Sequence, residues 1–274
     1  MRSVWIVAAK EFRDGLRNRW VLGVALVFAV LAVGLAYFGA AASGTVGFTS
    51  LATTIVSLAS LAVFLIPLIA LLLAYDSIVG EDERGTLLLL LSYPLSRSAL
   101  LTGKFLGHGA ILAVSTGLGF GVAGLIIALF SDQGGAPELW RVLALFIVSA
   151  SLLGWSFVAM AYVVSVFVAE KSRAAALALV VWFAFVLVFD LALLGILVTT
   201  GSGPWTQIVP YLLLLNPTDV FRLANLTSFD ATQVHSGLIS IGATFRLPEL
   251  LAALVGWVLG PFALAVWLFN RRAI

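Results

Sequence analysis

Long uninterrupted stretches of apolar side chains most limit the folds open to this chain. A helix that crosses the hydrocarbon of a bilayer, about 30 Å thick, needs about 20 mostly apolar residues. Six segments meet this requirement: Trp20–Phe38, Leu51–Ala74, Phe105–Phe130, Arg141–Val168, Ala174–Thr199 and Leu250–Asn270. The sequence therefore predicts an all-α polytopic membrane protein in which residues 1–274 form a single transmembrane domain with six transmembrane helices.

The composition agrees with a membrane protein and excludes several other classes. Hydrophobic residues make up 62% of the chain and charged residues 10%, whereas soluble domains carry about a quarter charged residues. With no cysteine in the sequence, there is no disulfide framework, no thiolate metal site and no cysteine nucleophile. The net charge of +2 is too small to indicate a nucleic acid partner.

The basic residues between the apolar segments predict the orientation in the membrane. Lys and Arg concentrate in cytoplasmic loops. One side would hold twelve of the 15 basic residues: Arg2, Lys10, Arg13, Arg17, Arg19, Arg84, Arg97, Lys104, Lys171, Arg173, Arg271 and Arg272. The other side would hold Arg141, Arg222 and Arg246. We therefore expect both termini to be cytoplasmic.

Residues 1–19 form an arm with the periodicity of an amphipathic helix. The apolar face consists of Trp5, Ala8, Ala9, Phe12 and Leu16, and the opposite face of Lys10, Arg13, Asp14 and Arg17. Such a helix lies in the membrane interface with its basic face toward anionic lipid headgroups. We therefore expect an interfacial elbow helix in contact with membrane lipid; the alternative is an arm that is simply solvated.

The densest run of charge lies in residues 76–104, between the second and third apolar segments. Within "GEDERGTLLLLLSYP", Gly85 breaks the chain, Thr86 is expected to cap a short helix, and Pro94 ends it. The five leucines from Leu87 to Leu91 are too few to span a bilayer, and a helix that is apolar all round must be buried. We expect some leucines to pack against the spans and the rest to contact a cytoplasmic partner. The acids that flank the leucines would form a charged rim around this contact. The alternative is a self-contained loop whose acids pair with Lys104 or the basic arm.

Residues 200–249 form a long outer connection. Its apolar part is too short to span and is expected to be re-entrant or interfacial, followed by small helices at the outer surface. Asp219 and Arg222 are three residues apart, so they would share one helical face. A connection of this length is usually functional.

Asp190, the two histidines and two glycine pairs are further candidate sites. Asp190 lies inside the fifth apolar segment and is a candidate intramembrane gate, or else it pairs with Arg141, Arg246 or a backbone group. His108 and His235 lack a second ligand at metal spacing, so no metal site is expected. The glycine pairs Gly103/Gly107 and Gly117/Gly121 are four residues apart and are expected to be helix-packing surfaces.

The stretch "GEDERGTLLLLLSYPLSRSALLTGKFLG", the six apolar segments and the amphipathic arm together resemble the type-two ABC transporter permeases. The resemblance implies that this inner connection is a cytoplasmic coupling helix that docks on an ATPase subunit. The docking residues it implies are Glu81, Asp82, Glu83, Gly85, Thr86, Leu87, Leu88, Leu89, Leu90 and Leu91.

The chain has no G-x-x-x-x-G-K-[ST] loop, so we expect no catalytic residue and no cofactor in it. ATP and Mg would be bound by separate cytoplasmic ATPase subunits. Two ATPases need two docking elements, which predicts a homodimer with a second copy of this chain. The expected location is the bacterial inner membrane.

The outer stretch "LLLLNPTDVFRLANL" is similar to the permease of the nitrous-oxide reductase maturation system. This implies a role in copper-site assembly and a periplasmic copper-binding accessory protein that contacts Asp219 and Arg222. The chain itself is not expected to conduct copper, because its only methionines are Met1 and Met160 and its two histidines lie on opposite sides. The alternative is an ABC exporter permease for an unrelated small or lipid-like substrate.

Overall fold

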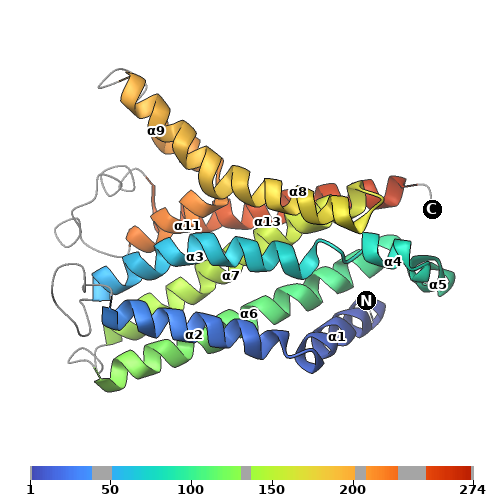
Figure 1. Ribbon diagram of the computed structural model, residues 1–274, viewed down its shortest axis with the longest axis horizontal. Helices are drawn as coiled ribbons and strands as arrows, with labels where there is room; N and C mark the ends of the chain where they lie inside the picture. Colours follow the sequence, from blue (N-terminus) through green and yellow to red (C-terminus); the bar gives the residue numbers. More distant parts are fainter. Residues whose placement is uncertain (1, 39–50, 131–136, 201–207, 228–244, 273–274) are drawn as a thin grey trace.

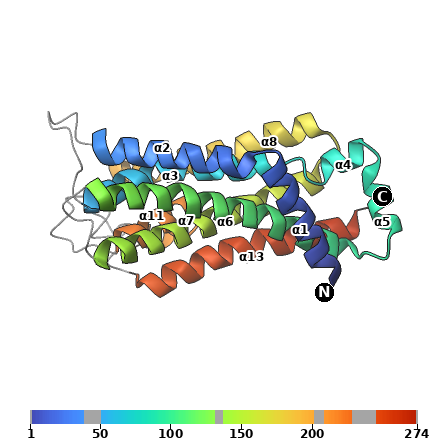
Figure 2. The same ribbon diagram turned by 90° about the horizontal axis from the view of Figure 1, so that it is seen from below.

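The computed structural model describes residues 2–38, 51–130, 137–200, 208–227 and 245–272, and every regular element in these ranges is a helix. The long helices run side by side along one axis, and the two ends of the described chain lie at the same end of the bundle (Figure 1, Figure 2). Among the described residues, six helices are long and apolar enough to cross a membrane. The predicted all-α, six-span fold is confirmed.

The spans agree with the predicted segments in number and differ at their ends. They are α2 (Trp20–Phe38), α3 (Leu51–Ala74), α6 (Arg97–Phe130), α7 (Pro137–Phe167), the composite of α8 (Lys171–Phe183), the π-helical turn η2 (Ala184–Val188) and α9 (Phe189–Thr200), and finally α13 (Leu247–Arg271). The largest difference is at α6: the apolar segment starts at Phe105, and the helix that contains it begins at Arg97, as a cap at Ser96 predicts. It does so because the hydroxyl of Ser96 accepts a hydrogen bond from the Ala99 backbone N–H at 3.2 Å and so caps the helix.

Helix α7 is the centre of the bundle and packs against α3, α6 and α13. Its aromatic side chains Phe146, Phe157 and Tyr162 are fully buried. The fifth span is at the edge, where the π-helical turn η2 interrupts it and α9 leans away from the other helices (Figure 1). Leu191, Leu194 and Val198 of α9 are exposed and apolar, as expected of surfaces that face lipid or another subunit.

The N-terminal arm forms helix α1 (Arg2–Arg17) and packs across the inner end of α6. Two glycines of α6 permit this contact. A Cβ atom at Gly103 would lie 2.6 Å from the Val7 Cβ, and one at Gly107 would lie 2.5 Å from the Glu11 Cβ. The face of α1 that packs on α6 therefore contains Val7 and Glu11, while Trp5 and Leu16 stay exposed. The membrane-interface position of α1 stays a prediction.

The glycine prediction for α6 is confirmed at Gly103 and Gly107. These two are packing positions, whereas a Cβ atom added at Gly117 or Gly121 would have no atom of another described element within 4 Å. Gly119 takes the close contact instead, since a Cβ there would lie 2.6 Å from the Phe28 Cβ on α2. A spacing of four residues recurs at two different phases of the helix, and only the packing decides which phase faces a neighbour.

Candidate functional site

The inner connection forms two short helices, α4 (Val79–Glu83) and α5 (Thr86–Ser92), at the end of the bundle where the chain termini lie (Figure 1). Gly85 joins them in the left-handed conformation with φ 68°, which glycine adopts without steric cost. Gly85 is therefore the N-cap of α5, and the prediction that Thr86 caps the helix is wrong. The Thr86 hydroxyl instead donates to the Glu81 carbonyl at 3.1 Å.

The leucine run is buried on one side only. Leu87 is completely buried in the main core, and Leu90 and Leu91 pack partly against it. Leu88 and Leu89 are 60% and 65% exposed, and Tyr93 just beyond the helix is 69% exposed. Two leucines and a tyrosine on a segment outside the predicted spans form an apolar patch without a partner in the described chain. We call Leu88, Leu89 and Tyr93 the docking patch.

The acids of the same segment point into the chain rather than around this patch. Asp76 pairs with the Lys171 ammonium at 2.7 Å, and Glu83 accepts from the backbone N–H of the same residue. Glu81 pairs with Lys104 at 2.8 Å and Asp82 with Arg272 at 2.7 Å. These contacts reach α6, α8 and the residue that follows α13. The alternative reading of the sequence, in which the acids pair within the chain, thus describes their geometry. A direct role of Glu81, Asp82 or Glu83 in docking stays a prediction.

Lys104 is the centre of a buried ion cluster. Its ammonium lies 2.8 Å from Glu81 and 2.9 Å from Glu11 of α1, and the three side chains are only 5%, 12% and 11% exposed. Burial is the largest influence and opposes ionisation of Glu11, but the charges of Lys104, His108 and Lys10 and the hydrogen bond from Lys104 together outweigh it and hold the pKa of that carboxyl below its ordinary value. One oxygen of Glu81 has no hydrogen-bond partner among the described residues. The cluster connects α4 and α1 to α6.

A chain of hydroxyl groups joins the start of α4 to α7. Ser165 accepts hydrogen bonds from the backbone N–H groups of Ile78 and Val79 at 2.9 and 3.1 Å. One turn away, the Ser77 hydroxyl donates to the Tyr162 hydroxyl, which lies 2.8 Å from His108 Nδ1. Sequence reasoning missed these residues, because serine and tyrosine in an apolar helix carry no pattern that indicates a partner 85 positions away.

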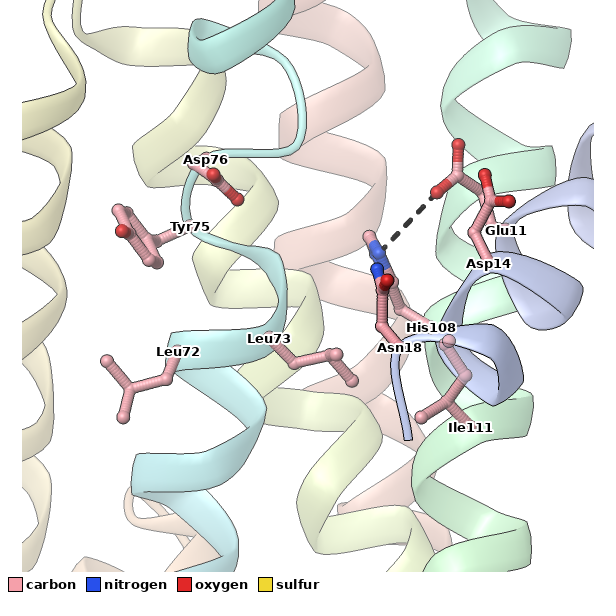
Figure 3. Close-up of a pocket in the computed structure, with 10 residues that line it drawn as sticks. Glu11, Asp14, Asn18, Leu72, Leu73, Tyr75, Asp76, His108 and Ile111 are labelled. Atoms are coloured by element: carbon pink, nitrogen blue, oxygen red, sulfur yellow. Dashed lines mark ion pairs between the residues drawn. The ribbon is translucent and has the colours of Figure 1, made fainter. Parts of the chain in front are cut away.

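A cavity of about 340 Å³ lies beside the ion cluster, between α1, the end of α3 and α6 (Figure 3). Glu11, Asp14, Asp76 and His108 line it, and His108 Nε2 lies 3.8 Å from Glu11. Asp14 and Asp76 are already paired with lysines. Among the described residues no three His, Cys, Asp or Glu side chains are arranged to hold a metal ion.

At the outer half of the bundle, α11 (Pro217–Leu226) carries a second set of charges. Arg222 donates to Asp219 at 2.8 Å and to Asp190 at 3.1 Å. The prediction that Asp219 and Arg222 share a helical face is confirmed. The partner expected for Asp190 was wrong: it is Arg222, not Arg141 or Arg246, because α11 folds back against the π-helical turn of the fifth span.

These charges form one wall of a cavity of about 280 Å³ whose other walls are apolar, among them Leu193 and Leu213. The Asp219 side chain is 2% exposed and the Arg222 side chain 22%, so Arg222 is the more accessible of the two to a partner. The partner contact and the gating role of Asp190 stay predictions. Residues 201–207 and 228–244 of the outer connection, which include His235, lie outside the described residues.

Comparison with known proteins covers nearly the whole chain. The family model described as ABC-2 family transporter protein matches residues 5–274. The chain is 55% identical over 274 residues to a Stutzerimonas stutzeri protein named "Probable ABC transporter permease protein NosY", with 99% of each chain covered. It is 53% identical over 276 residues to a protein of the same name from Pseudomonas aeruginosa, with 100% of both chains covered. The matched residues include the docking patch, the ion cluster and the charges of α11.

Proposed function

The chain belongs to the ABC-2 family of transporter proteins and is similar throughout to ABC transporter permeases, and from this premise we propose that a separate ATPase subunit docks on α4 and α5. The observation that carries the proposal is the docking patch, in which Leu88 and Leu89 are exposed although they belong to an apolar helix. An exposed apolar cluster of this kind marks a contact with another protein. The acids beneath it bind other helices of the chain, so that a force on α5 reaches the spans.

The proposed assembly contains two copies of this chain and two ATPase subunits, in which ATP and Mg are bound. Each chain offers one docking patch among its described residues, whereas a pair of cooperating ATPases needs two. The exposed apolar face of α9, with Leu191, Leu194 and Val198, supports a contact within the membrane. We place the assembly in the bacterial inner membrane with both termini cytoplasmic, in agreement with the distribution of basic residues.

For the biological role we propose copper-site maturation of nitrous-oxide reductase, on the basis of the outer motif around Asp219 and Arg222 and the two permease relatives. Copper(I) prefers soft ligands, and the described residues contain no series of such ligands along a span. Met160 is 93% buried within α7, and His108 is hydrogen-bonded to Tyr162. The permease therefore moves another species or transmits force to a periplasmic copper-binding protein. An unrelated amphiphilic substrate is the second candidate, and the largely apolar cavity beside Arg222 favours it.

The docking proposal is tested by Leu89→Asp, which places a charge in the apolar contact at a cost of several kcal/mol. The matched control is Ser96→Asp, which adds the same charge to the same segment and keeps the cap of α6. We expect the ATPase to co-purify with the wild type and with Ser96→Asp and to be lost from Leu89→Asp. Equal recovery of the ATPase from both variants would contradict docking on α5.

A further inference from the structure

The inner end of α13, the last span, lies at the coupling segment although the two are far apart in the sequence. Both views place this end of α13 at the same end of the bundle as α4 and α5 (Figure 1, Figure 2). Six hydrogen bonds connect this end of α13 to residues 82–98, which we call the coupling segment. They join Asp82, Arg97 and Ser98 to Phe269, Asn270 and Arg272. Two arginines make most of these contacts.

Arg97, the first residue of α6, caps the carboxyl end of α13. The last carbonyl groups of a helix have no partner within it. One nitrogen of the Arg97 guanidinium donates to the carbonyls of Phe269, at 3.2 Å, and of Arg272. The neighbouring Ser98 and Asn270 side chains also bond to each other at 3.0 Å. The end of the last span is therefore fixed to the start of α6.

Arg272 makes the complementary connection. One nitrogen of its guanidinium donates to the Val166 carbonyl at 3.1 Å, in the last turn of α7, and the other to Asp82 of α4 at 2.7 Å. The side chains of Arg272 and Asp82 are 18% and 32% exposed. A planar guanidinium suits this position, because its separate N–H groups can bind a carbonyl and a carboxylate at once. A single side chain thus joins α4, the central helix α7 and the end of α13.

We propose that Arg272 is a positioning residue for ATPase coupling, which holds α4 against the inner ends of α7 and α13 so that displacement of α4 moves both spans. Helix α4 has five residues, and so short a helix owes its stability to its surroundings. A displacement of α4 is therefore transmitted through its side-chain contacts, among them the ion pair of Asp82 with Arg272. The proposal rests on the proposed function, since it assumes that an ATPase moves the coupling segment.

The chain provides a matched control in the adjacent arginine. Arg271 stacks over the Trp267 ring, 4.3 Å from its centroid, whereas Arg272 bonds to Asp82. Arg272→Gln removes the link, and Arg271→Gln removes an equal charge one residue away. Asp82→Asn breaks the ion pair while it leaves Arg272 bonded to Val166, so it tests the link even if Arg272→Gln folds poorly. Arg272→Lys keeps a cation for Asp82.

The experiment uses the complex of the permease with its ATPase in nanodiscs. Because the chain has no cysteine, cysteines placed at the exposed positions Leu129 on α6 and Val255 on α13 can be spin-labelled without background. The change in label separation between the nucleotide-free and the ATP–vanadate state is then measured by pulsed electron resonance. The amount of ATPase in each complex is measured beside it.

The shifted population is the fraction of complexes whose label separation changes in the ATP–vanadate state. We expect it to be the same in the wild type and in Arg271→Gln and to fall about fivefold or more in Arg272→Gln and Asp82→Asn, the size of a typical coupling between sites. Arg272→Lys should recover part of the shifted population. The double variant Arg272→Gln/Asp82→Asn should retain as much of it as Arg272→Gln alone, because both changes break the same link. The ATPase content should be equal in the wild type, Arg271→Gln, Arg272→Gln and Arg272→Lys, none of which changes a residue of α4 or α5.

Three results would overturn the inference. An undiminished shift in both Arg272→Gln and Asp82→Asn would show that the link carries no motion. Loss of the ATPase from Arg272→Gln, but not from Arg271→Gln, would make Arg272 part of the docking surface instead. Absence of a shift in the wild type would overturn the proposed function together with this inference, since there would be no motion to position.

Discussion

At the scale of single residues, the charges at the inner end of the bundle act as internal ties. Lys104 illustrates this, because its buried ammonium is shared between Glu11 and Glu81 and compensates two carboxylates from different helices. Breaking a buried pair by removing one partner leaves an uncompensated charge, whereas an exposed pair contributes little. The same amino acid should therefore matter very differently at two nearby positions.

We expect Lys104→Met to destabilise the protein by about 3–5 kcal/mol, since in a buried site Glu81 loses its counter-ion and Glu11 loses the nearer of its two lysine partners. The control is Lys10→Met on α1, where Lys10 is 59% exposed and pairs with the half-exposed Asp14 at 3.2 Å and with Glu11 at 3.3 Å; because this lysine is exposed, its loss should cost about 0–1 kcal/mol. Thermal unfolding in detergent, followed by size-exclusion chromatography, measures both. Similar midpoints for the two variants would mean that Lys104 is not the centre of the cluster.

At the scale of elements, α1 is attached to α6 by close packing as well as by charge. The contact depends on glycines that let the two helices approach, and the acid Glu11 lies on the packed face of α1 rather than on its solvated one. Helix α1 is thereby joined through α6 to the coupling segment. Movement of α4 should then reach the elbow as well as the spans.

Gly107→Ala should destabilise the attachment of α1 by about 1–3 kcal/mol, because the new Cβ would lie 2.5 Å from the Glu11 Cβ and 3.0 Å from the Ala8 carbonyl oxygen. Gly117→Ala in the same helix has open space around the Cβ and should be neutral or stabilising by up to about 1 kcal/mol. Unfolding midpoints in detergent separate the two. A neutral Gly107→Ala would show that α1 is not held at this distance.

At the scale of the whole molecule, the two ends of the bundle differ in chemistry. The inner end contains the docking patch, the ion cluster and the Arg97 and Arg272 contacts. The outer half contains α11 with its shared guanidinium and an apolar cavity. The proposed function assigns the ATPase contact to the first end and the effect on a substrate or partner to the second, with the spans connecting the two.

The topology prediction follows from the twelve basic residues on one side and three on the other. A reporter that fluoresces only in the cytoplasm should be bright when fused after Ile274 and dark when inserted near Ser131. The fusion is made in cells that express the complete complex, with total protein measured by immunoblot as the control. A bright signal at Ser131 would reverse the assignment of the two ends.

The prediction about copper concerns the path through the molecule. We expect the triple variant His108→Gln, Met160→Leu and His235→Gln to leave the copper content of nitrous-oxide reductase largely intact, because these residues form no relay of soft ligands. Glutamine at position 108 can still bond to Tyr162. Arg222→Gln, which breaks both ion pairs of α11, should lower the copper content by weakening the outer segment. Abolished copper loading in the triple variant, with the complex intact, would show that the chain carries the metal.

The number and approximate limits of the spans could be predicted from the sequence, and so could the short helix after Gly85. The reason is that these features are local: the thickness of the hydrocarbon sets the length of an apolar helix whatever its neighbours are. The pairing of Asp219 with Arg222, three residues apart, could be predicted for the same reason. The family resemblance rested on features of the same local kind: one continuous inner stretch, the six apolar segments and the amphipathic arm.

Only the tertiary structure decided which charges meet and which leucines stay exposed. Lys104 and Glu11 are 93 residues apart, and Asp82 and Arg272 are 190 apart, so each pair exists only because particular helices pack side by side. The same holds for Asp190, whose partner comes from a helix that folds back against the fifth span. An acidic side chain can pair with any basic side chain that lies close enough, and the packing of the helices decides which ones do. For this reason the acidic run could be read from the sequence as a rim around a partner site, whereas the fold turns its carboxylates inward and leaves Leu88 and Leu89 outside.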